Sequence, residues 1–251
     1  MQKNFHLNAI IISILITLLC TSCAFNKLFY QATRLPAGTK QITFKSASDS
    51  VTVHFVGNNH QPVFVKNSND TIHFGYTIES VLFCSTNGDT LNGWWLQPDK
   101  QPILGTILHL HGNGGCLASQ FKAIAPLAEK GFQIFMFDYS GYGFSEGKAN
   151  RKTVLENALS ALDYVQSKTS VKDLKLIIYG QSLGGHLASV VASERQNDIN
   201  GLVIEGAFSS HKDIANHMVP VLGKLFVKNG YSAYKSIRTF HKPLLVIHST
   251  E

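Results

Sequence analysis

Residues 174–185 read LKLIIYGQSLGG, and this stretch decides the fold of the 251-residue chain. An apolar run of strand length, Leu174–Tyr179, enters the turn 180–184, and a helix rich in small residues, Leu187–Ser193, follows. A sharp strand-to-helix turn lifts a serine hydroxyl above a sheet, and its crowded backbone requires very small residues on either side. The stretch therefore predicts that Ser182 is a catalytic nucleophile. A chance match in a glycine-rich turn is the alternative.

A serine that attacks a carbonyl also needs hydrogen-bond donors for the negative charge that develops on the carbonyl oxygen, and two backbone amides usually supply them. Leu183, directly after Ser182, is the first candidate. The second is Asn113, because its loop 111–115 follows the apolar run Thr106–His111. A plain glycine turn is the alternative interpretation of this loop.

After Pro98, continuous apolar runs alternate with segments of helical period, which predicts an α/β fold with a mostly parallel sheet and helices on both faces. The predicted strands are Thr106–His111, Gln133–Phe137, Leu174–Tyr179, Gly201–Glu205 and Pro243–His248, and the predicted helices include Thr153–Gln166 and Leu187–Ser193. Before Pro98, short alternating runs predict an antiparallel, β-rich N-terminal edge with a hairpin turn at Asn87–Asp89. These runs are Ile42–Lys45, Val51–Val56, Val63–Val65, Thr71–Tyr76, Ser80–Cys84 and Leu91–Leu96.

The N-terminus has the pattern of a secretory signal, with Lys3, an apolar stretch from Ala9 to Cys20, and small residues after it. Residues 20–23 resemble the lipobox of bacterial lipoproteins, although Cys20 stands where that pattern usually has leucine. We therefore expect a lipoprotein signal peptide at 1–22, a lipid anchor on Cys23 and a linker at 23–40. The expected location is the bacterial cell envelope, at the outer membrane or periplasmic face. An ordinary cleaved signal is the alternative.

The chain carries 22 basic and 16 acidic residues, a formal net charge of +6, with no basic run that would indicate a nucleic-acid partner. His109 and His111 lie on one face of a predicted strand, but no metal-binding spacing accompanies them, so we expect no metal or cofactor. We expect His109 in the core, His111 bracing loop 111–115, and Asp138 fixing the turn 139–143 by hydrogen bonds. Cys84 and Cys116 are either paired or free thiols, and the sequence does not determine the oligomeric state.

Residues 111–115, 137–147, 180–185 and 201–210 resemble the α/β-hydrolase superfamily, within it the branch of small serine hydrolases of the esterase, acyl-hydrolase and serine-aminopeptidase type. The resemblance covers about residues 76–251. It implies an α/β-hydrolase domain at 41–251 with a lid at about 208–239. It also implies a small-molecule acyl substrate, an ester, thioester or amide, that forms an acyl-enzyme on Ser182.

In that branch the catalytic acid follows a segment like His248–Thr250, and the catalytic histidine comes a strand later. The resemblance thus implies that acid, base, last strand and last helix fall beyond Glu251, which would impair the 251-residue chain. Glu205 is either a substitute acid or a structural residue. His186, His211, His217 and His241 are other imidazoles, none assigned as the base. The competing hypothesis is a catalytically inactive lipoprotein that uses the hydrolase scaffold for binding.

Overall fold

The computed structural model describes residues 26, 29–45, 50–66, 70–220, 223–227 and 230–249. The predicted signal peptide 1–22 and the predicted lipidation site Cys23 lie outside these residues. In the described ranges, no helix combines the length and the apolar character that a membrane crossing requires.

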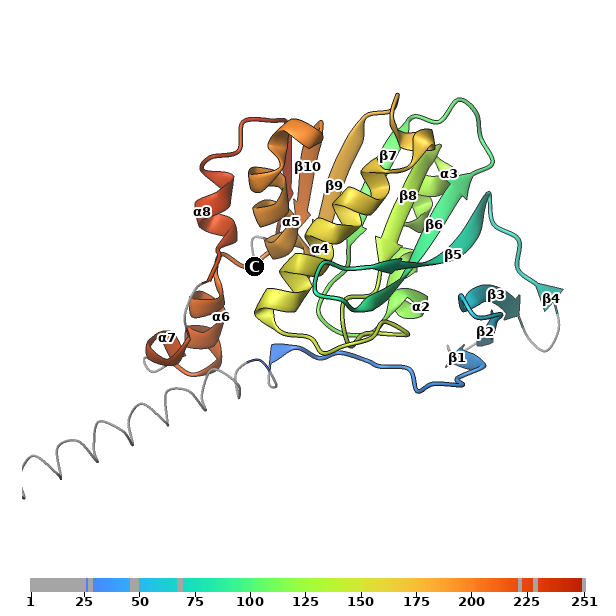
Figure 1. The fold of residues 1–251 in the computed structure, drawn as a ribbon, viewed down its shortest axis with the longest axis horizontal. Helices are drawn as coiled ribbons and strands as arrows, with labels where there is room; N and C mark the ends of the chain where they lie inside the picture. Colours follow the sequence, from blue (N-terminus) through green and yellow to red (C-terminus); the bar gives the residue numbers. More distant parts are fainter. Residues whose placement is uncertain are drawn as a thin grey trace, which may run out of the picture.

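A mixed sheet of seven strands forms the centre of the described structure, in the order β11-β10-β9-β7-β8-β6-β5 (Figure 1). Its parallel strands are β7 (Gly105–Leu110), β8 (Phe132–Phe137), β9 (Leu176–Gln181), β10 (Gly201–Glu205) and β11 (Leu244–Ile247). The strands β5 (Tyr76–Cys84) and β6 (Thr90–Pro98) are antiparallel to each other, and β6 is antiparallel to β8. The predicted α/β architecture, with its antiparallel N-terminal edge, is confirmed.

A second, antiparallel sheet precedes the main one and contains β1 (Gln41–Lys45), β2 (Ser50–Val56), β3 (Gln61–Lys66) and β4 (Asp70–Thr71). The prediction of a single strand at Thr71–Tyr76 was wrong, because the chain changes sheets there. Ile72 still donates its amide to Phe64 O at 2.8 Å, whereas Tyr76 already pairs with Pro98 in the main sheet. Phe74 packs between the two sheets, edge-on to Phe64 and stacked on Tyr76.

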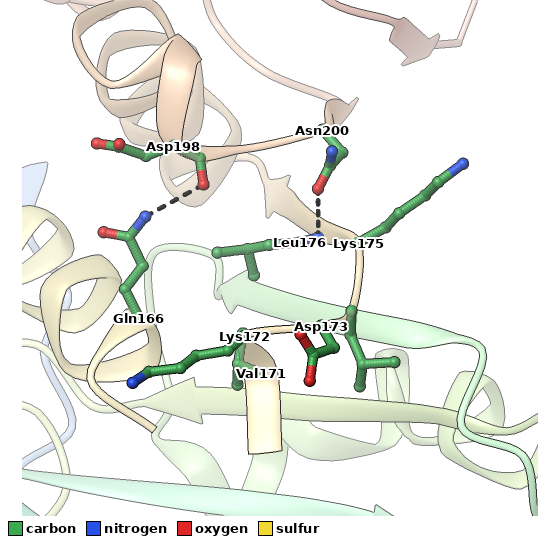
Figure 2. Close-up of a pocket in the computed structure, with 9 residues that line it drawn as sticks. Gln166, Val171, Lys172, Asp173, Lys175, Leu176, Asp198 and Asn200 are labelled. Carbon is green, nitrogen blue, oxygen red and sulfur yellow. Dashed lines mark hydrogen bonds between the residues drawn. The ribbon is translucent and has the colours of Figure 1, made fainter. Parts of the chain in front are cut away.

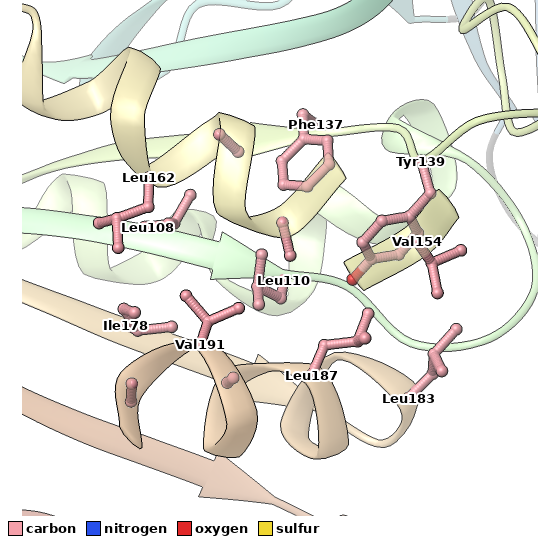
Figure 3. Close-up of a cluster of buried hydrophobic side chains, with 14 of the residues drawn as sticks. Leu108, Leu110, Phe137, Tyr139, Val154, Leu162, Ile178, Leu183, Leu187 and Val191 are labelled. Atoms are coloured by element: carbon pink, nitrogen blue, oxygen red, sulfur yellow. The ribbon is translucent and has the colours of Figure 1, made fainter. Parts of the chain in front are cut away.

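Helices cover both faces of the main sheet, because its central strands are apolar on both sides. On one face α4 (Arg151–Gln166) and α5 (Leu183–Glu194) bury one large core, which Figure 3 shows with Leu183, Leu187 and Val191 of α5 turned toward Leu108 and Leu110 of β7. On the other face lie α2 (Leu117–Gln120), η1 (Phe121–Ala123), α3 (Ala125–Glu129) and side chains of the small sheet.

The remaining elements are short. Two 3-10 helices, η2 (Thr169–Val171) and η3 (Gln196–Asp198), lead into β9 and β10. The helices α6 (His211–Met218), α7 (Gly223–Phe226) and α8 (Ala233–Ile237) fall in the predicted lid segment. In Figure 1, α8 lies beside α5, and α6 and α7 lie below α8.

Candidate active site

The chain bends sharply at Ser182, between the end of β9 and the first residue of α5. Ser182 has φ 52° and ψ −111°, a backbone conformation that non-glycine residues rarely adopt. Its amide donates to Glu205 O at 2.8 Å, and its carbonyl accepts from His186 N at 3.1 Å, so both backbone groups are satisfied. The residue is exposed, whereas Leu183 beside it is fully buried. The strained turn therefore holds the hydroxyl clear of the sheet.

Two glycines allow this turn because backbone passes directly beside them. A Cβ on Gly180 would collide with Gly184 O and would lie 2.6 Å from Ala188 Cβ. A Cβ on Gly184 would collide with Leu110 O, at the end of the neighbouring strand β7. Glycine at these positions lets α5 start directly against β7 and β9, which fixes where Ser182 stands.

Loop 111–115 leaves β7 and passes beside this turn. A Cβ placed on Gly112 would lie 3.7 Å from Ser182 Cβ, which shows how close the loop comes to the serine. Within the described residues, the backbone amides of Asn113 and Leu183 donate no hydrogen bond. The loop and the turn, which are about 70 residues apart in sequence, therefore lie side by side.

Buried side chains brace the loop from below. His111 Nδ1 lies 2.8 Å from Gly112 O, and Tyr139 donates its hydroxyl to His111 O at 2.9 Å. His111 Nε2 lies 3.6 Å from Asp138 Oδ1. Burial lowers the pKa of His111 to about 4 and raises the pKa of Asp138 to about 8, so both groups are neutral near pH 7. The expected bracing role of His111 is confirmed.

Asp138 does not bind the turn that follows it, contrary to the expectation from sequence. Its Oδ1 accepts the amide of Leu117 at 2.9 Å, at the start of α2. The turn is held instead by Asn157, whose Oδ1 accepts from Ser140 N at 2.8 Å, and by Ser145, whose hydroxyl donates to the backbone carbonyl of Asp138 at 2.6 Å. The Asp138 side chain thus joins two loops that follow neighbouring strands.

Glu205 ends β10 next to Ser182, and its carboxylate faces neighbouring strand residues. One oxygen accepts from the hydroxyl of Tyr179 and the other from Gln181 Nε2 at 3.3 Å. Both partners belong to β9, so the carboxylate ties the ends of β9 and β10 together. This geometry matches the structural role left open for Glu205.

Comparison with known proteins gives the family. The family model described as alpha/beta hydrolase fold matches residues 105–242, more than half of the chain. The chain belongs to this family. The uncharacterised protein YfhR of Escherichia coli K12 is 33% identical over 178 residues, which span 69% of this chain and 62% of YfhR. The chain thus matches less than two thirds of the length of that relative.

Other relatives are more distant. The alpha/beta hydrolase domain-containing protein WAV2 of Arabidopsis thaliana is 29% identical over 161 residues, 64% of this chain and 51% of WAV2. Among solved structures, an alpha-beta hydrolase of Vibrio vulnificus superposes with a TM-score of 0.60 at 22% identity, covering 69% of this chain and 64% of that one. An esterase of Pyrococcus furiosus gives a TM-score of 0.54 at 18% identity, covering 68% and 70%. These structures share the fold.

Among the described residues, no histidine side chain is hydrogen-bonded to the Ser182 hydroxyl. His186 is stacked on Phe208, its Nδ1 lies 3.0 Å from Phe208 O, and burial lowers its pKa to about 4. His211 Nε2 lies 3.5 Å from the hydroxyl of Tyr30, and its burial, together with nearby His186, lowers its pKa to about 2. His217 and His241 are exposed. In the described part of the chain, the Ser182 hydroxyl has no hydrogen-bond partner.

A metal-binding group and a cavity were two other possible markers of a site in the described part of the chain. Within the described ranges, no group of histidine, cysteine and acidic side chains is arranged to hold a metal ion. His109 is fully buried, with its ring edge-on to Tyr179, and burial lowers its pKa to about 3. A cavity of about 420 Å³ opens where β9 begins, at Leu176, the opposite end of the strand from Ser182 (Figure 2).

Sequence reasoning missed the side-chain role of Asn113. Its Oδ1 accepts from Gln31 N at 3.0 Å and from the Tyr142 hydroxyl at 2.8 Å, and its Nδ2 donates to Phe29 O. Residues 29–31 fall within the predicted linker. No local sequence pattern predicts a contact between Asn113 and residues about 80 positions earlier in the chain, so this contact is visible only in the folded structure.

Proposed function

We propose that this chain is a serine hydrolase that cleaves an ester, thioester or amide through an acyl-enzyme on Ser182, with a carboxylic ester as the preferred substrate class. One observation carries the proposal: an exposed serine held at φ 52° and ψ −111°, with loop 111–115 beside it. Strain of this kind costs stability, and it persists where the surrounding structure enforces it, as at active sites.

The proposed chemistry begins when Ser182 Oγ attacks the carbonyl carbon of the substrate. The Oγ–C bond forms, the carbonyl oxygen becomes negative, and the Oγ proton passes to a base. The amides of Asn113 and Leu183 would donate to this oxyanion, because neither amide has a partner within the described residues. The alcohol, thiol or amine then leaves with a proton, and water hydrolyses the acyl ester to regenerate the serine.

The rate of acyl transfer depends strongly on a base that accepts the proton of Ser182 Oγ. A serine hydroxyl keeps its proton near neutral pH, so a site without a base loses several orders of magnitude in rate. Because no described imidazole is hydrogen-bonded to Ser182 Oγ, the competing function is an inactive lipoprotein that uses the scaffold for binding. The two functions differ in whether Ser182 reacts covalently.

A fluorophosphonate probe tests the proposal, since it reacts with an activated serine and stays attached. The 251-residue chain and any longer product of the same gene are labelled in parallel, and the modified residue is mapped by mass spectrometry. We expect labelling at Ser182 in at least one form, none in its Ser182→Ala variant, and hydrolysis of p-nitrophenyl esters by the form that labels. If every form fails to label, the binding function is favoured.

We also propose that a lipid on Cys23 anchors the hydrolase at the bacterial cell envelope, because residues 20–23 resemble a lipobox. Metabolic labelling with an alkyne fatty acid, with Cys23→Ser as the control, is the test. Incorporation that survives the substitution would contradict the assignment of Cys23.

A further inference from the structure

Residues 29–35 form a strap across the end of the sheet that carries Ser182. Ala32 forms a parallel bridge with Gly115, and Arg34 forms another with Gly143. Gly143 donates its amide to Thr33 O at 2.9 Å, and Leu35 donates to Gly143 O at 2.8 Å. In Figure 1 the strap is the blue segment below the main sheet. It therefore pairs by backbone with loop 111–115 and with the block 139–147.

The N-terminal end of the strap is fixed by aromatic packing. Phe29 and Tyr30 are 8% and 7% exposed, so the strap is anchored in the core although it lies in a predicted linker. The Phe29 ring is edge-on to Phe208 at 5.6 Å and to His211 at 5.9 Å between ring centroids. The strap thus contacts the predicted lid as well as the loop beside the serine.

The Asn113 side chain connects the strap and the loop in addition to the bridge between Ala32 and Gly115. Both polar atoms of this side chain are hydrogen-bonded, Nδ2 to Phe29 O and Oδ1 to Gln31 N and the Tyr142 hydroxyl. The same residue carries the free backbone amide proposed for the oxyanion. Three side-chain hydrogen bonds restrict rotation of the peptide that contains this amide. Oxyanion donors are effective when they are held in place before the reaction.

We propose that Asn113 is a positioning residue whose side chain latches the strap 29–35 to loop 111–115 and thereby aims its own backbone amide at the reacting carbonyl. This inference rests on the proposed function, because it assigns Asn113 a role in the same acyl transfer. It also makes the strap part of the site.

The first test removes the latch in steps. Tyr142→Phe deletes one hydroxyl donor without changing shape, and Asn113→Ala deletes all three side-chain bonds. Because a misaimed oxyanion donor weakens transition-state binding, we expect kcat to fall about 3- to 10-fold in the first and about 10- to 100-fold in the second, with KM within about 3-fold of the parent. The matched control is Asn200→Ala: Asn200 Oδ1 accepts Leu176 N at 2.8 Å at the far end of β9 (Figure 2).

The second test acts on the strap itself. Gln31 is exposed, so Gln31→Ala changes little, whereas Gln31→Pro removes the amide that donates to Asn113 Oδ1. We expect Gln31→Pro to lower kcat with KM unchanged. In the Asn113→Ala background, Gln31→Pro should lower kcat no further, because the bond is already absent.

The measurements use whichever form of the hydrolase labels with the fluorophosphonate, and urea unfolding confirms that each variant is folded. If kcat is equal in the parent and in folded Asn113→Ala, the proposed role of the Asn113 side chain is wrong, whereas the proposed hydrolase function still stands. A rise in KM with unchanged kcat also overturns this role, since the amide would then act on ground-state binding. If no parent form labels or turns over an ester, the proposed function fails and the latch fails with it. If Asn113→Ala does not fold, the proposal is tested by the kcat of Tyr142→Phe and by the comparison of Gln31→Pro with Gln31→Ala.

Discussion

Replacing Ser182 by glycine should stabilise the protein relative to replacing it by alanine. Both variants lose the hydroxyl, and both keep the backbone bonds from Ser182 N to Glu205 O and from His186 N to Ser182 O. They differ in the backbone conformation they tolerate. Alanine at φ 52° and ψ −111° keeps the strain of the native turn, whereas glycine adopts positive φ readily.

The size of the effect follows from two opposing terms. A non-glycine residue in such a region costs about 1–3 kcal/mol. Glycine loses more chain entropy on folding, which costs roughly 0.5–1 kcal/mol relative to alanine. The net advantage of Ser182→Gly over Ser182→Ala is therefore about 1 kcal/mol, or a melting temperature about 2–4 °C higher for a domain of this size.

Urea unfolding followed by circular dichroism measures the difference, provided that the two variants share one m-value. Ser189 supplies the matched control because it lies in α5, where it donates to Gly185 O at 2.8 Å, and has an ordinary helical backbone. At this position glycine should be less stable than alanine by about 1 kcal/mol. If Ser182→Gly is no more stable than Ser182→Ala while the Ser189 pair behaves normally, the turn at Ser182 is not strained.

Three further predictions concern the surroundings of the serine. Gly184→Ala should lower the unfolding free energy by about 3 kcal/mol or more in urea titrations, because the added Cβ would collide with Leu110 O. The control is Gly230→Ala, where a Cβ would meet nothing within 4 Å, and it should change the unfolding free energy by less than about 0.5 kcal/mol. Burial raises the pKa of Asp138 from 3.8 to about 8, so the stabilisation from this shift is full below pH 4 and is lost as pH rises through 8. The unfolding free energy of the parent should thus fall relative to Asp138→Asn between pH 5 and 9, and parallel pH curves would contradict the buried assignment. Glu205→Gln should leave the fluorophosphonate labelling rate of Ser182 within about 3-fold, whereas loss of a true catalytic acid would reduce it by about 10⁴-fold.

The turn at Ser182 could be predicted from sequence because its requirements are local. Gly180 and Gly184 stand within two residues of the serine, and each is required by backbone that approaches it in the folded chain. The strand and helix on either side follow from periodicity, although β9 begins at Leu176, two residues later than predicted. The loop at Asn113 was predictable for a related reason, since glycines after a buried strand indicate a loop at its end.

The partners of Asp138 and Asn113 could not be predicted, because they are distant in sequence. The amide that Asp138 accepts belongs to Leu117, at the start of a helix whose orientation depends on how η1 and α3 pack on the sheet. The Asn113 side chain binds a segment that has no strand or helix signal of its own. A polar side chain in a loop has many possible hydrogen-bond partners, and the packing of the loops determines which partner it binds.

The strand order places the site independently of the serine motif. Along the chain, β7 is followed by β8 on one side, whereas β9 and β10 are added on the other side of β7. The connections that leave β7 and β9 therefore diverge at the carboxyl ends of adjacent strands, which is where open α/β sheets bind their ligands. Ser182 follows β9 and loop 111–115 follows β7, so the chemical motif and the topology indicate the same place. The cavity at Leu176 lies neither beside the serine motif nor at the carboxyl ends of the strands, because it opens where β9 begins. A substrate that bound there would lie the full length of the strand away from the serine hydroxyl, so the geometry favours the carboxyl end as the place where an acyl group is transferred.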